Sequence, residues 1–369
     1  MKVFIKKYLP FVYAILVRIK SLFVLLRNPE LTSADSYFAE YADNRYSRME
    51  IFIQQCKHIM KYGHPNDFFF LYGLDIKGLH CADNYVDYGK FMIRRDFLNS
   101  KTPHSPIALL RNKFLFGVVA KALNIPTPNN IGIVEDGYLS PLGNNGKIKF
   151  DDYIKDNVID TFVKTIDGEC ADGVYSLGIN KGDISVNGES KTYDELCAIL
   201  QNGKYLLQEK LTQHNAISKI YPGSINTIRL ETVYNARTKK IEILPPLLRV
   251  GTGTNKVDNW AVGGLSIGID TEYSHLCKYG FYKPSFGTKT PVHPNSGVVF
   301  DGYEIPFLQE SIRLAKLFHS YITEVHSIGW DIAITENGPC FIEGNDNWEI
   351  SLVQICSHGL QKEFNELFE

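Results

Sequence analysis

The chain has 369 residues, with 39 lysine and arginine side chains against 41 aspartate and glutamate side chains and a formal net charge of -2. This length exceeds what one hydrophobic core usually supports, so several subdomains are expected. No long block carries one sign of charge, which argues against a nucleic-acid partner. The seven cysteines are scattered without a CxxC pair, which argues against both a disulfide framework and a zinc site and fits a reducing cytoplasm.

The N-terminal segment, residues 1–26, is strongly apolar but carries four basic side chains, at Lys6, Lys7, Arg18 and Lys20. Its longest charge-free run is shorter than the roughly 20 apolar residues that a membrane-spanning helix needs. No small-residue cleavage site of a signal peptide follows it. Two interpretations stay open: a helix that lies in the membrane interface, and a helix that packs against its own protein or a partner.

Residues 31–125 are predicted to be mainly helical, because apolar positions recur at helical spacing after cap-like residues. Residues 67–74 are an aromatic run of strand or helix type, and a helix is predicted from about Lys113 to Leu123, stopped by Asn124 and two prolines. No chemical role is legible before Lys113.

From residue 126 onward, short β-rich runs predict an α+β nucleotide-binding lobe and then a second β-rich lobe. The candidate strands of the first lobe are 129–137, 146–150, 157–166, 173–180, 183–188 and 204–211, with a helix at 192–203. Those of the second lobe are 225–235, 240–250, 263–270, 297–300 and a final hairpin at 330–345, with helices at about 306–325 and from about Ile350.

The final hairpin carries the candidate metal ligands. Alternation places Glu343 and Asn345 on one face of its second strand, and Asp331 lies on its first strand. Carboxylate and amide oxygens are ligands that Mg²⁺ accepts. The alternative is an ordinary surface hairpin with its polar side chains outward.

The turn of this hairpin decides which face Asp331 occupies. A two-residue loop at Asn337-Gly338 would place Asp331 opposite Gly344 and on the other face, whereas a three-residue loop would place it opposite Asn345. A metal site here therefore predicts the longer turn or a β-bulge.

Four basic residues lie in or beside otherwise apolar segments: Lys113, Lys164, Arg229 and Arg249. Guanidinium groups suit the bidentate acceptors of phosphate or acyl phosphate, and lysines suit phosphate as point charges. Solvated lysines and structural ion pairs are the alternatives. After Lys164, the glycine-containing turn at 167–174 could hold phosphate through its backbone N–H groups, or be merely a turn.

In the segment 258–270, a loop before a strand contains Asp258, Asn259, Gly263 and Gly264. Its paired glycines allow either close approach of the backbone to a ligand or a simple bulge.

Taken in chain order, these segments resemble the ATP-grasp superfamily and, within it, the sugar-transfer-associated ATP-grasp family. The resemblance covers roughly residues 72–354, and its most specific segments are GSINTIRL, LLRVG, VDNWAVGGLSIGID and SIGWDIAITENGPCFIEGN. It implies an ATP-grasp fold of class α+β, in which two α+β lobes sandwich ATP after a mainly helical N-terminal region. The expected divisions are residues 1–30, 31–125, 126–211 and 212–369.

The resemblance also implies roles for individual residues. Lys113, Lys164 and Gly173 would meet the nucleotide phosphates, and Glu209 and the Leu211 backbone would meet adenine at the hinge. Arg229 and Arg249 would be catalytic, binding the transferring phosphate or acyl phosphate. Asp331, Glu343 and Asn345 would hold Mg²⁺. The acceptor side would be formed by Ser224, Asn226, Asp258, Asn259, Gly263 and Gly264. Asn112 and Ala171 depart from the family pattern.

The expected activity is an ATP- and Mg²⁺-dependent carboxylate–amine ligase that works through an acyl phosphate and serves bacterial surface polysaccharide, such as capsule. Its partners would be small or sugar-linked carboxylates and amines, with no nucleic acid. Cytoplasmic localisation is expected, with peripheral contact at the inner face of the membrane through residues 1–26 as an open alternative. A phosphotransferase that stops at a phosphorylated product, and a non-catalytic nucleotide-binding module of a glycan-assembly complex, are the alternative functions.

Overall fold

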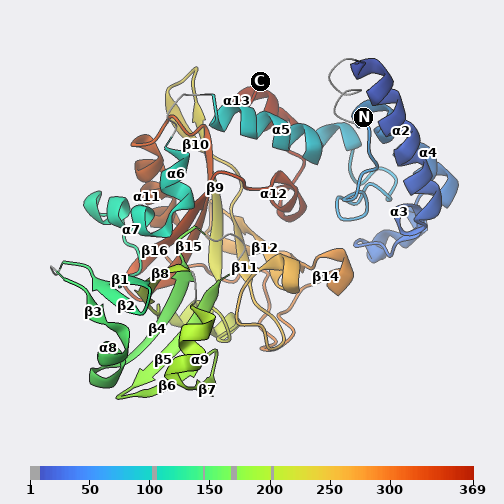
Figure 1. Ribbon diagram of the computed structural model, residues 1–369. Helices are drawn as coiled ribbons and strands as arrows, with labels where there is room; N and C mark the ends of the chain where they lie inside the picture. Colours follow the sequence, from blue (N-terminus) through green and yellow to red (C-terminus); the bar gives the residue numbers. More distant parts are fainter. Residues whose placement is uncertain (1–8, 102–105, 144–145, 168–172, 201–202) are drawn as a thin grey trace.

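The structure is a computed structural model, and it describes residues 9–101, 106–143, 146–167, 173–200 and 203–369. Two antiparallel sheets with helices packed around them form the body of the molecule, and the first helices stand to one side of it (Figure 1). This arrangement confirms the α+β class and the helical N-terminal region predicted from the sequence.

The N-terminal region is a series of helices joined by turns. Its elements are α2 (Pro10–Arg27), α3 (Glu30–Ser33), η1 (Ala39–Asn44), α4 (Arg48–Tyr62), η2 (Ala82–Asn84), α5 (Tyr88–Asn99), α6 (Ile107–Arg111) and α7 (Lys113–Ala122). A capping box between Ser47 and Glu50 begins α4, and Gly63 ends it with a φ of 93°, a conformation that glycine adopts without strain. The mainly helical character predicted for this region is therefore found, and α7 confirms the helix predicted from about Lys113 to Leu123.

Residues 67–74 form consecutive turns, so the prediction of a strand or helix there was wrong. The four successive side chains of Phe69, Phe70, Leu71 and Tyr72 are all buried. Successive side chains of a strand point to opposite faces, whereas all four of these side chains lie in one core. The turns bury all four.

The smaller sheet has the strand order β3-β2-β1-β8-β4-β5-β6-β7. Its elements are β1 (Asn130–Glu135), β2 (Tyr138–Pro141), β3 (Ile148–Lys149), α8 (Phe150–Asp156), β4 (Val158–Thr165), β5 (Val174–Asn180), β6 (Asp183–Val186), β7 (Glu189–Lys191), α9 (Tyr193–Ile199) and β8 (Lys204–Glu209). The strand predicted at 146–150 is cut short because α8 begins at Phe150, where Asp151 and Asp152 favour the N-terminus of a helix.

The larger sheet has the order β14-β13-β12-β11-β9-β15-β16, and β10 pairs with β9. Its elements are α10 (Asn215–Ile220), β9 (Thr227–Asn235), β10 (Lys240–Ile243), β11 (Leu247–Val250), η3 (Trp260–Val262), β12 (Leu265–Asp270), β13 (His275–Phe281), η4 (Pro284–Phe286), β14 (Lys289–Thr290), α11 (Leu308–Ser320), β15 (Ser327–Thr335), β16 (Gly338–Asn345), α12 (Ile350–Cys356) and α13 (Gln361–Leu367).

Two predicted strands of this sheet need correction. The run at 240–250 divides into β10 and β11 because Pro245 and Pro246 have no N–H for a ladder. The strand predicted at 297–300 is reduced to an isolated bridge between Val292 and Val299. β13 was not predicted. Its buried and exposed residues do not alternate, so apolar residues do not recur at every second position of its sequence.

Two cores hold the larger sheet in place. One lies under α7 and α11 and includes Phe116, Phe318 and Trp330. The other joins the N-terminal region to the C-terminal helices through side chains that include Phe91, Trp348 and Phe364. Helices that precede both sheets in the sequence and helices that follow them therefore pack against the same large lobe.

His319 is a neutral histidine in the first core. Trp330 Nε1 donates to Thr232 Oγ1 at 2.8 Å, that hydroxyl lies 2.8 Å from His319 Nδ1, and His319 Nε2 lies 2.8 Å from the Val325 carbonyl. A carbonyl only accepts, so the Nε2 proton points at Val325 and Nδ1 accepts from Thr232. Burial lowers the pKa of His319 to about 4.

The free energy of unfolding is expected to fall as the pH drops below 6.5. His319 of the unfolded chain binds a proton near pH 6.5, whereas His319 of the folded chain stays neutral until about pH 4. This group alone should cost about 2 kcal/mol between roughly pH 6.5 and pH 5. Urea unfolding at several pH values measures the loss. His319→Gln should keep a shallower pH dependence, since burial also lowers the pKa of His326 to about 4. Identical slopes for the two proteins would contradict this assignment.

Candidate functional site

The predicted hairpin is formed by β15 and β16, and its turn is a two-residue loop. Thr335 pairs with Gly338, so Glu336 and Asn337 make the turn. The longer turn that the sequence allowed is not found, and the loop begins one residue earlier than the Asn337-Gly338 position. Asn337 N donates to Thr335 Oγ1 at 3.2 Å inside this turn.

A bulge in β16 gives the hairpin the geometry that a metal site required. Ile332 pairs with Phe341, whereas Asp331 pairs with Glu343, so Ile342 is the extra residue. Ile332 and Phe341 remain in the core on one face. On the other face, the bulge places Asp331 opposite Glu343, and the predicted β-bulge is confirmed.

Asp331, Glu343 and Asn345 lie together on this face. Asn345 Nδ2 is 3.5 Å from Asp331 Oδ2 and 3.5 Å from Glu343 Oε1. Burial and the charge of Asp331 raise the pKa of Glu343. The two acids therefore compete for ionisation, and a cation between them would relieve the competition. The donor set suits Mg²⁺, with Asn345 turning its amide oxygen toward the ion.

The two predicted catalytic arginines both contact Asp331. Arg229 binds it through both oxygens, with Nε–Oδ1 at 2.6 Å and Nη2–Oδ2 at 3.1 Å. Arg249 Nη2 lies 3.4 Å from Asp331 Oδ2 and 3.1 Å from Asp258 Oδ1. Burial would raise the pKa of Asp331, but the two arginines outweigh it and lower the pKa to about 2. Each carboxylate oxygen has two lone pairs, so these contacts leave Asp331 able to bind a metal as well.

Asp258 belongs to the arginine cluster and does not face outward. It accepts hydrogen bonds from Thr227 N at 3.0 Å, from the Thr227 hydroxyl and from Arg249. Asn259 caps η3 through Ala261 N at 2.8 Å. The loop therefore uses both polar side chains to hold its own shape and to position Arg249.

The two glycines of this loop are explained by the loop itself. Gly263 has a φ of 97°, and a Cβ on Gly264 would lie 2.7 Å from the Asp258 carbonyl oxygen. Gly264 therefore allows a close approach, but the approach is to the chain's own backbone.

Ser224 and Asn226, which the resemblance placed on the acceptor side, make their hydrogen bonds within the chain. Both are buried, and Ser224 Oγ donates to Asn226 Oδ1 at 3.0 Å. Asn226 also binds Gln213, the Tyr221 carbonyl and Gly251 N. Their hydrogen-bonding groups are thus used within the chain, where they fix the segment that leads into β9.

Lys164 lies on β4 of the smaller sheet and points toward the hairpin of the larger one. Its Nζ donates to Gln208 Oε1 at 2.8 Å, and Gln208 Nε2 donates to Asn130 Oδ1 at 2.8 Å. Burial lowers the pKa of Lys164 to about 8, an effect that Glu343 opposes and Lys113 reinforces. The structure therefore brings both predicted phosphate lysines close to the predicted metal ligands.

Lys113 begins α7 and ties this helix to the smaller sheet, because its backbone N donates to Ile166 O at 2.9 Å. The preceding Asn112 caps the helix through Leu115 N at 2.9 Å. The same segment is fixed to β16 by Arg111, which binds Asp346 through both oxygens at 2.9 Å and 2.8 Å.

The predicted adenine contacts lie at the end of β8. Glu209 is exposed, and its Oε1 accepts from Asn129 Nδ2 at 3.1 Å; Leu211 follows the strand and is half-buried. Glu209 and Asn129 line a cavity of about 870 Å³, whose lining does not include the charged cluster. Gly173 ends the predicted phosphate turn with a φ of 67°, but residues 168–172, including Ala171, lie outside the described residues.

Glu231 was missed from the sequence, although it lies two residues after Arg229 on the same face of β9. It is 1% exposed, and burial raises its pKa to about 7. Among the described residues, neither Glu231 Oε2 nor Arg249 Nε has a hydrogen-bond partner. Strand alternation could have placed Glu231 beside the arginines, but a glutamate in a strand is more often solvated.

Arg229→Met should lower the free energy of unfolding by roughly 3 kcal/mol or more, because it leaves the Asp331 charge buried without its bidentate partner. Chemical denaturation measures the change. The control is Arg313→Met, which breaks an exposed pair with Glu310 and should cost less than about 1 kcal/mol. Equal losses in the two variants would show that Arg229 does not hold a buried charge.

Comparison with solved structures finds remote similarity. An N5-carboxyaminoimidazole ribonucleotide synthetase from Thermus thermophilus is 11% identical with a TM-score of 0.37, over 71% of this chain and 53% of that chain. A D-alanine–D-alanine ligase from Helicobacter pylori is 13% identical with a TM-score of 0.38, over 70% and 60%. One from Bacillus anthracis, complexed with ATP, is 12% identical with a TM-score of 0.31, over 65% and 55%.

The chain thus matches between 53% and 60% of the length of these enzymes. No functionally curated protein matches it in sequence. The family described as sugar-transfer associated ATP-grasp matches residues 92–367, a range that contains both sheets, the arginine cluster and the metal-type hairpin. The chain belongs to the sugar-transfer associated ATP-grasp family.

Proposed function

We propose that the chain is an ATP-dependent carboxylate–amine ligase. The observation that carries the proposal is the meeting of opposite charges between the two sheets. Lys164 of the smaller sheet lies close enough to Glu343 of the larger sheet for this carboxylate to raise the pKa of the lysine. Arg229 and Arg249 lie beside Asp331 of the same site. Cations for phosphate and oxygen ligands for Mg²⁺ therefore face one region, as phosphoryl transfer from ATP needs.

In the proposed reaction, an oxygen of the substrate carboxylate attacks the γ-phosphorus of ATP, and ADP leaves. The nitrogen of an amine then attacks the carbonyl carbon of the acyl phosphate and expels inorganic phosphate. The protein's part is to position the reactants and to neutralise charge. Lys113 and Lys164 would hold the phosphates, while Arg229 and Arg249 would bind the transferring group.

Asp331, Glu343 and Asn345 would hold Mg²⁺, which supplies charge neutralisation at the phosphates. Their fit to the ion rests on the pairing of buried Asp331 with half-buried Glu343 across the bulge, since the charge of Asp331 helps to raise the pKa of Glu343. Glu209 and the backbone at Leu211 would meet adenine at the hinge. The family's description associates it with sugar transfer, so sugar-linked carboxylates or amines of bacterial surface polysaccharide are the proposed substrates.

Glu343→Gln should leave the fold intact and lower Mg²⁺-dependent ADP release by roughly 100-fold or more, because a neutral amide binds Mg²⁺ weakly. A coupled assay of ADP release measures the loss. The matched control is Glu336→Gln at the turn of the same hairpin, whose exposed side chain accepts a hydrogen bond from Asn215 N that glutamine can also accept. Unchanged turnover in Glu343→Gln would refute the metal site.

The substrates are identified by an ADP-release screen of amino acids against uronic acids and their nucleotide sugars, followed by product analysis. An amide product with free phosphate supports the ligase. A stable phosphorylated product would show that the chain is a phosphotransferase instead. ATP binding without turnover would show that it is a non-catalytic nucleotide-binding module.

We also propose that α2 lies on a membrane surface. One side of α2 packs on α4, where Arg18 Nε donates to Met60 O at 3.0 Å and Ser21 Oγ donates to Gly63 O at 2.7 Å. The other side exposes a stripe of large apolar residues: Phe11, Val12, Ile15, Leu16, Ile19, Phe23 and Leu26. Among the described residues, no helix is long and apolar enough to cross a membrane. A helix held by its protein on one side and apolar on the other suits the interface.

Ile15→Glu with Phe23→Glu should reduce co-sedimentation with anionic lipid vesicles several-fold and spare ATP turnover, because it places charges in the exposed stripe. Met49→Glu with Met60→Glu is the control, since these exposed residues lie on α4. Point changes are preferable to deletion of residues 1–26, which would also remove the contacts to α4. Equal vesicle binding by wild type and the stripe variant would contradict a membrane role.

A further inference from the structure

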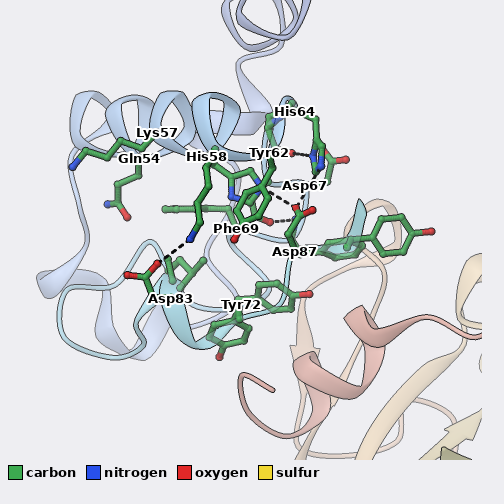
Figure 2. A pocket seen from close by; sticks show the side chains of 18 of the residues that line it. Gln54, Lys57, His58, Tyr62, His64, Asp67, Phe69, Tyr72, Asp83 and Asp87 are labelled. Atoms are coloured by element: carbon green, nitrogen blue, oxygen red, sulfur yellow. Dashed lines mark hydrogen bonds and ion pairs between the residues drawn. The ribbon is translucent and has the colours of Figure 1, made fainter. Parts of the chain in front are cut away.

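A second polar cluster lies far from the hairpin, where the end of α4, the turn after it and the start of α5 meet. Figure 2 shows the imidazoles of His58 and His64 turned toward the carboxylate of Asp87. His58 Nε2 lies 3.1 Å and His64 Nε2 lies 3.4 Å from the same oxygen, Asp87 Oδ2. One ligand-type atom from each of the three residues lies within 4.8 Å of the others.

The tautomer of His64 makes this arrangement unusual. His64 Nδ1 lies 2.9 Å from the Pro65 carbonyl, which can only accept, so Nδ1 carries a proton. In neutral His64 the Nε2 atom is then a lone pair aimed at a carboxylate oxygen 3.4 Å away. A proton or a metal ion bound to Nε2 therefore lies between these two atoms. A carbonyl that fixes Nδ1–H and leaves Nε2 free is also how proteins orient metal-binding histidines.

Asp87 is held in place by a separate interaction. Its Oδ1 accepts from Lys90 N at 2.8 Å as the N-cap of α5, which leaves Oδ2 for the histidines. Its side chain is 4% exposed, whereas those of His58 and His64 are 17% and 40% exposed. The carboxylate is therefore fixed and buried, and the imidazoles close the cluster on its open side.

The separations of the two imidazole nitrogens from Asp87 Oδ2 fit a small divalent ion. With metal–nitrogen and metal–oxygen bonds of about 2.0–2.1 Å, the edges of a tetrahedral site are roughly 3.3 Å long. The observed separations of 3.1 Å and 3.4 Å bracket this value. Two imidazoles and one carboxylate are a ligand set of zinc and similar transition metals, and three protein ligands leave one position open.

A cavity of about 570 Å³ opens beside the cluster. His58, His64 and Asp87 line it together with Lys57 and other residues of α4 and of the turns at 64–69 and 82–88. Figure 2 shows Lys57, Tyr62 and Asp67 around the same space. An ion at the cluster would therefore have its open position toward this cavity, where water or a small anion could complete the coordination.

We propose that His58, His64 and Asp87 bind one divalent transition-metal ion of the zinc type, separate from the Mg²⁺ of the ATP site. The scattered cysteines carry no information about this site, because it uses none of them. The ion takes the position between His64 Nε2 and Asp87 Oδ2. It joins α4 to α5 and presents its open coordination position to the cavity.

The test uses the full chain carrying Glu343→Gln, so that the ATP site does not contribute, after removal of metals with a chelator. Titration with Co²⁺ alone should give one equivalent of binding with visible bands typical of a four-coordinate ion. His64→Gln and His58→Gln should each weaken binding at least tenfold. His358→Gln, which changes an exposed histidine near the C-terminus, should leave it unchanged.

Gly89→Ala tests the geometry without removing a ligand. A Cβ at this position would lie 3.0 Å from His64 Nε2, so the methyl group should crowd the metal position while alanine favours the helix. Weaker Co²⁺ binding in a protein that melts no lower than wild type supports the site. Binding that is equal in wild type and the double variant His58→Gln, His64→Gln would overturn it and leave a proton-bridged ion pair only.

Discussion

Asp331 carries a charge with only 2% of its surface exposed, and both of its oxygens are bound by Arg229. Arg249 approaches the same carboxylate and is itself held by Asp258. A buried charge is tolerable only when its partners are in place, so the strands β9, β11 and β15 must keep their register for the fold to persist. The proposed catalytic groups are therefore also the groups that fix the centre of the larger sheet.

Much of this site follows from sequence periodicity. Alternation predicts that Glu343 shares a face with Asn345, and the requirement that Asp331 join them predicts a longer turn or a bulge. The turn is short, and β16 contains the bulge. The positions of Lys113 at a helix start and Lys164 in a strand could be predicted in the same way. These predictions succeed because each depends on local geometry alone, with a period of two or of 3.6 residues.

Other features depend on contacts between distant segments, and the sequence did not contain a signal for them. The polar side chains of Ser224 and Asn226 resemble substrate ligands in a loop, but they are used to fasten that loop to Gln213 and Gly251. The cluster of His58, His64 and Asp87 is assembled from a helix end, a turn and a cap. No motif links such positions, because their spacing depends on how α4 and α5 pack.

α5 connects that cluster to the larger sheet. Asp87 caps its first turn, and Asn99 at its last turn binds Ser327 N, Ser327 O and Asp346 O at 3.0, 3.1 and 2.8 Å. Ser327 begins β15, and Asp346 follows β16 and binds Arg111. The helix is about 18 Å long, so it acts as a rigid strut between two places where ions are proposed to bind. Thermodynamic coupling is reciprocal: if an ion bound at one end of α5 changes the affinity of the other end for its ion, the second ion changes the affinity of the first end by the same factor.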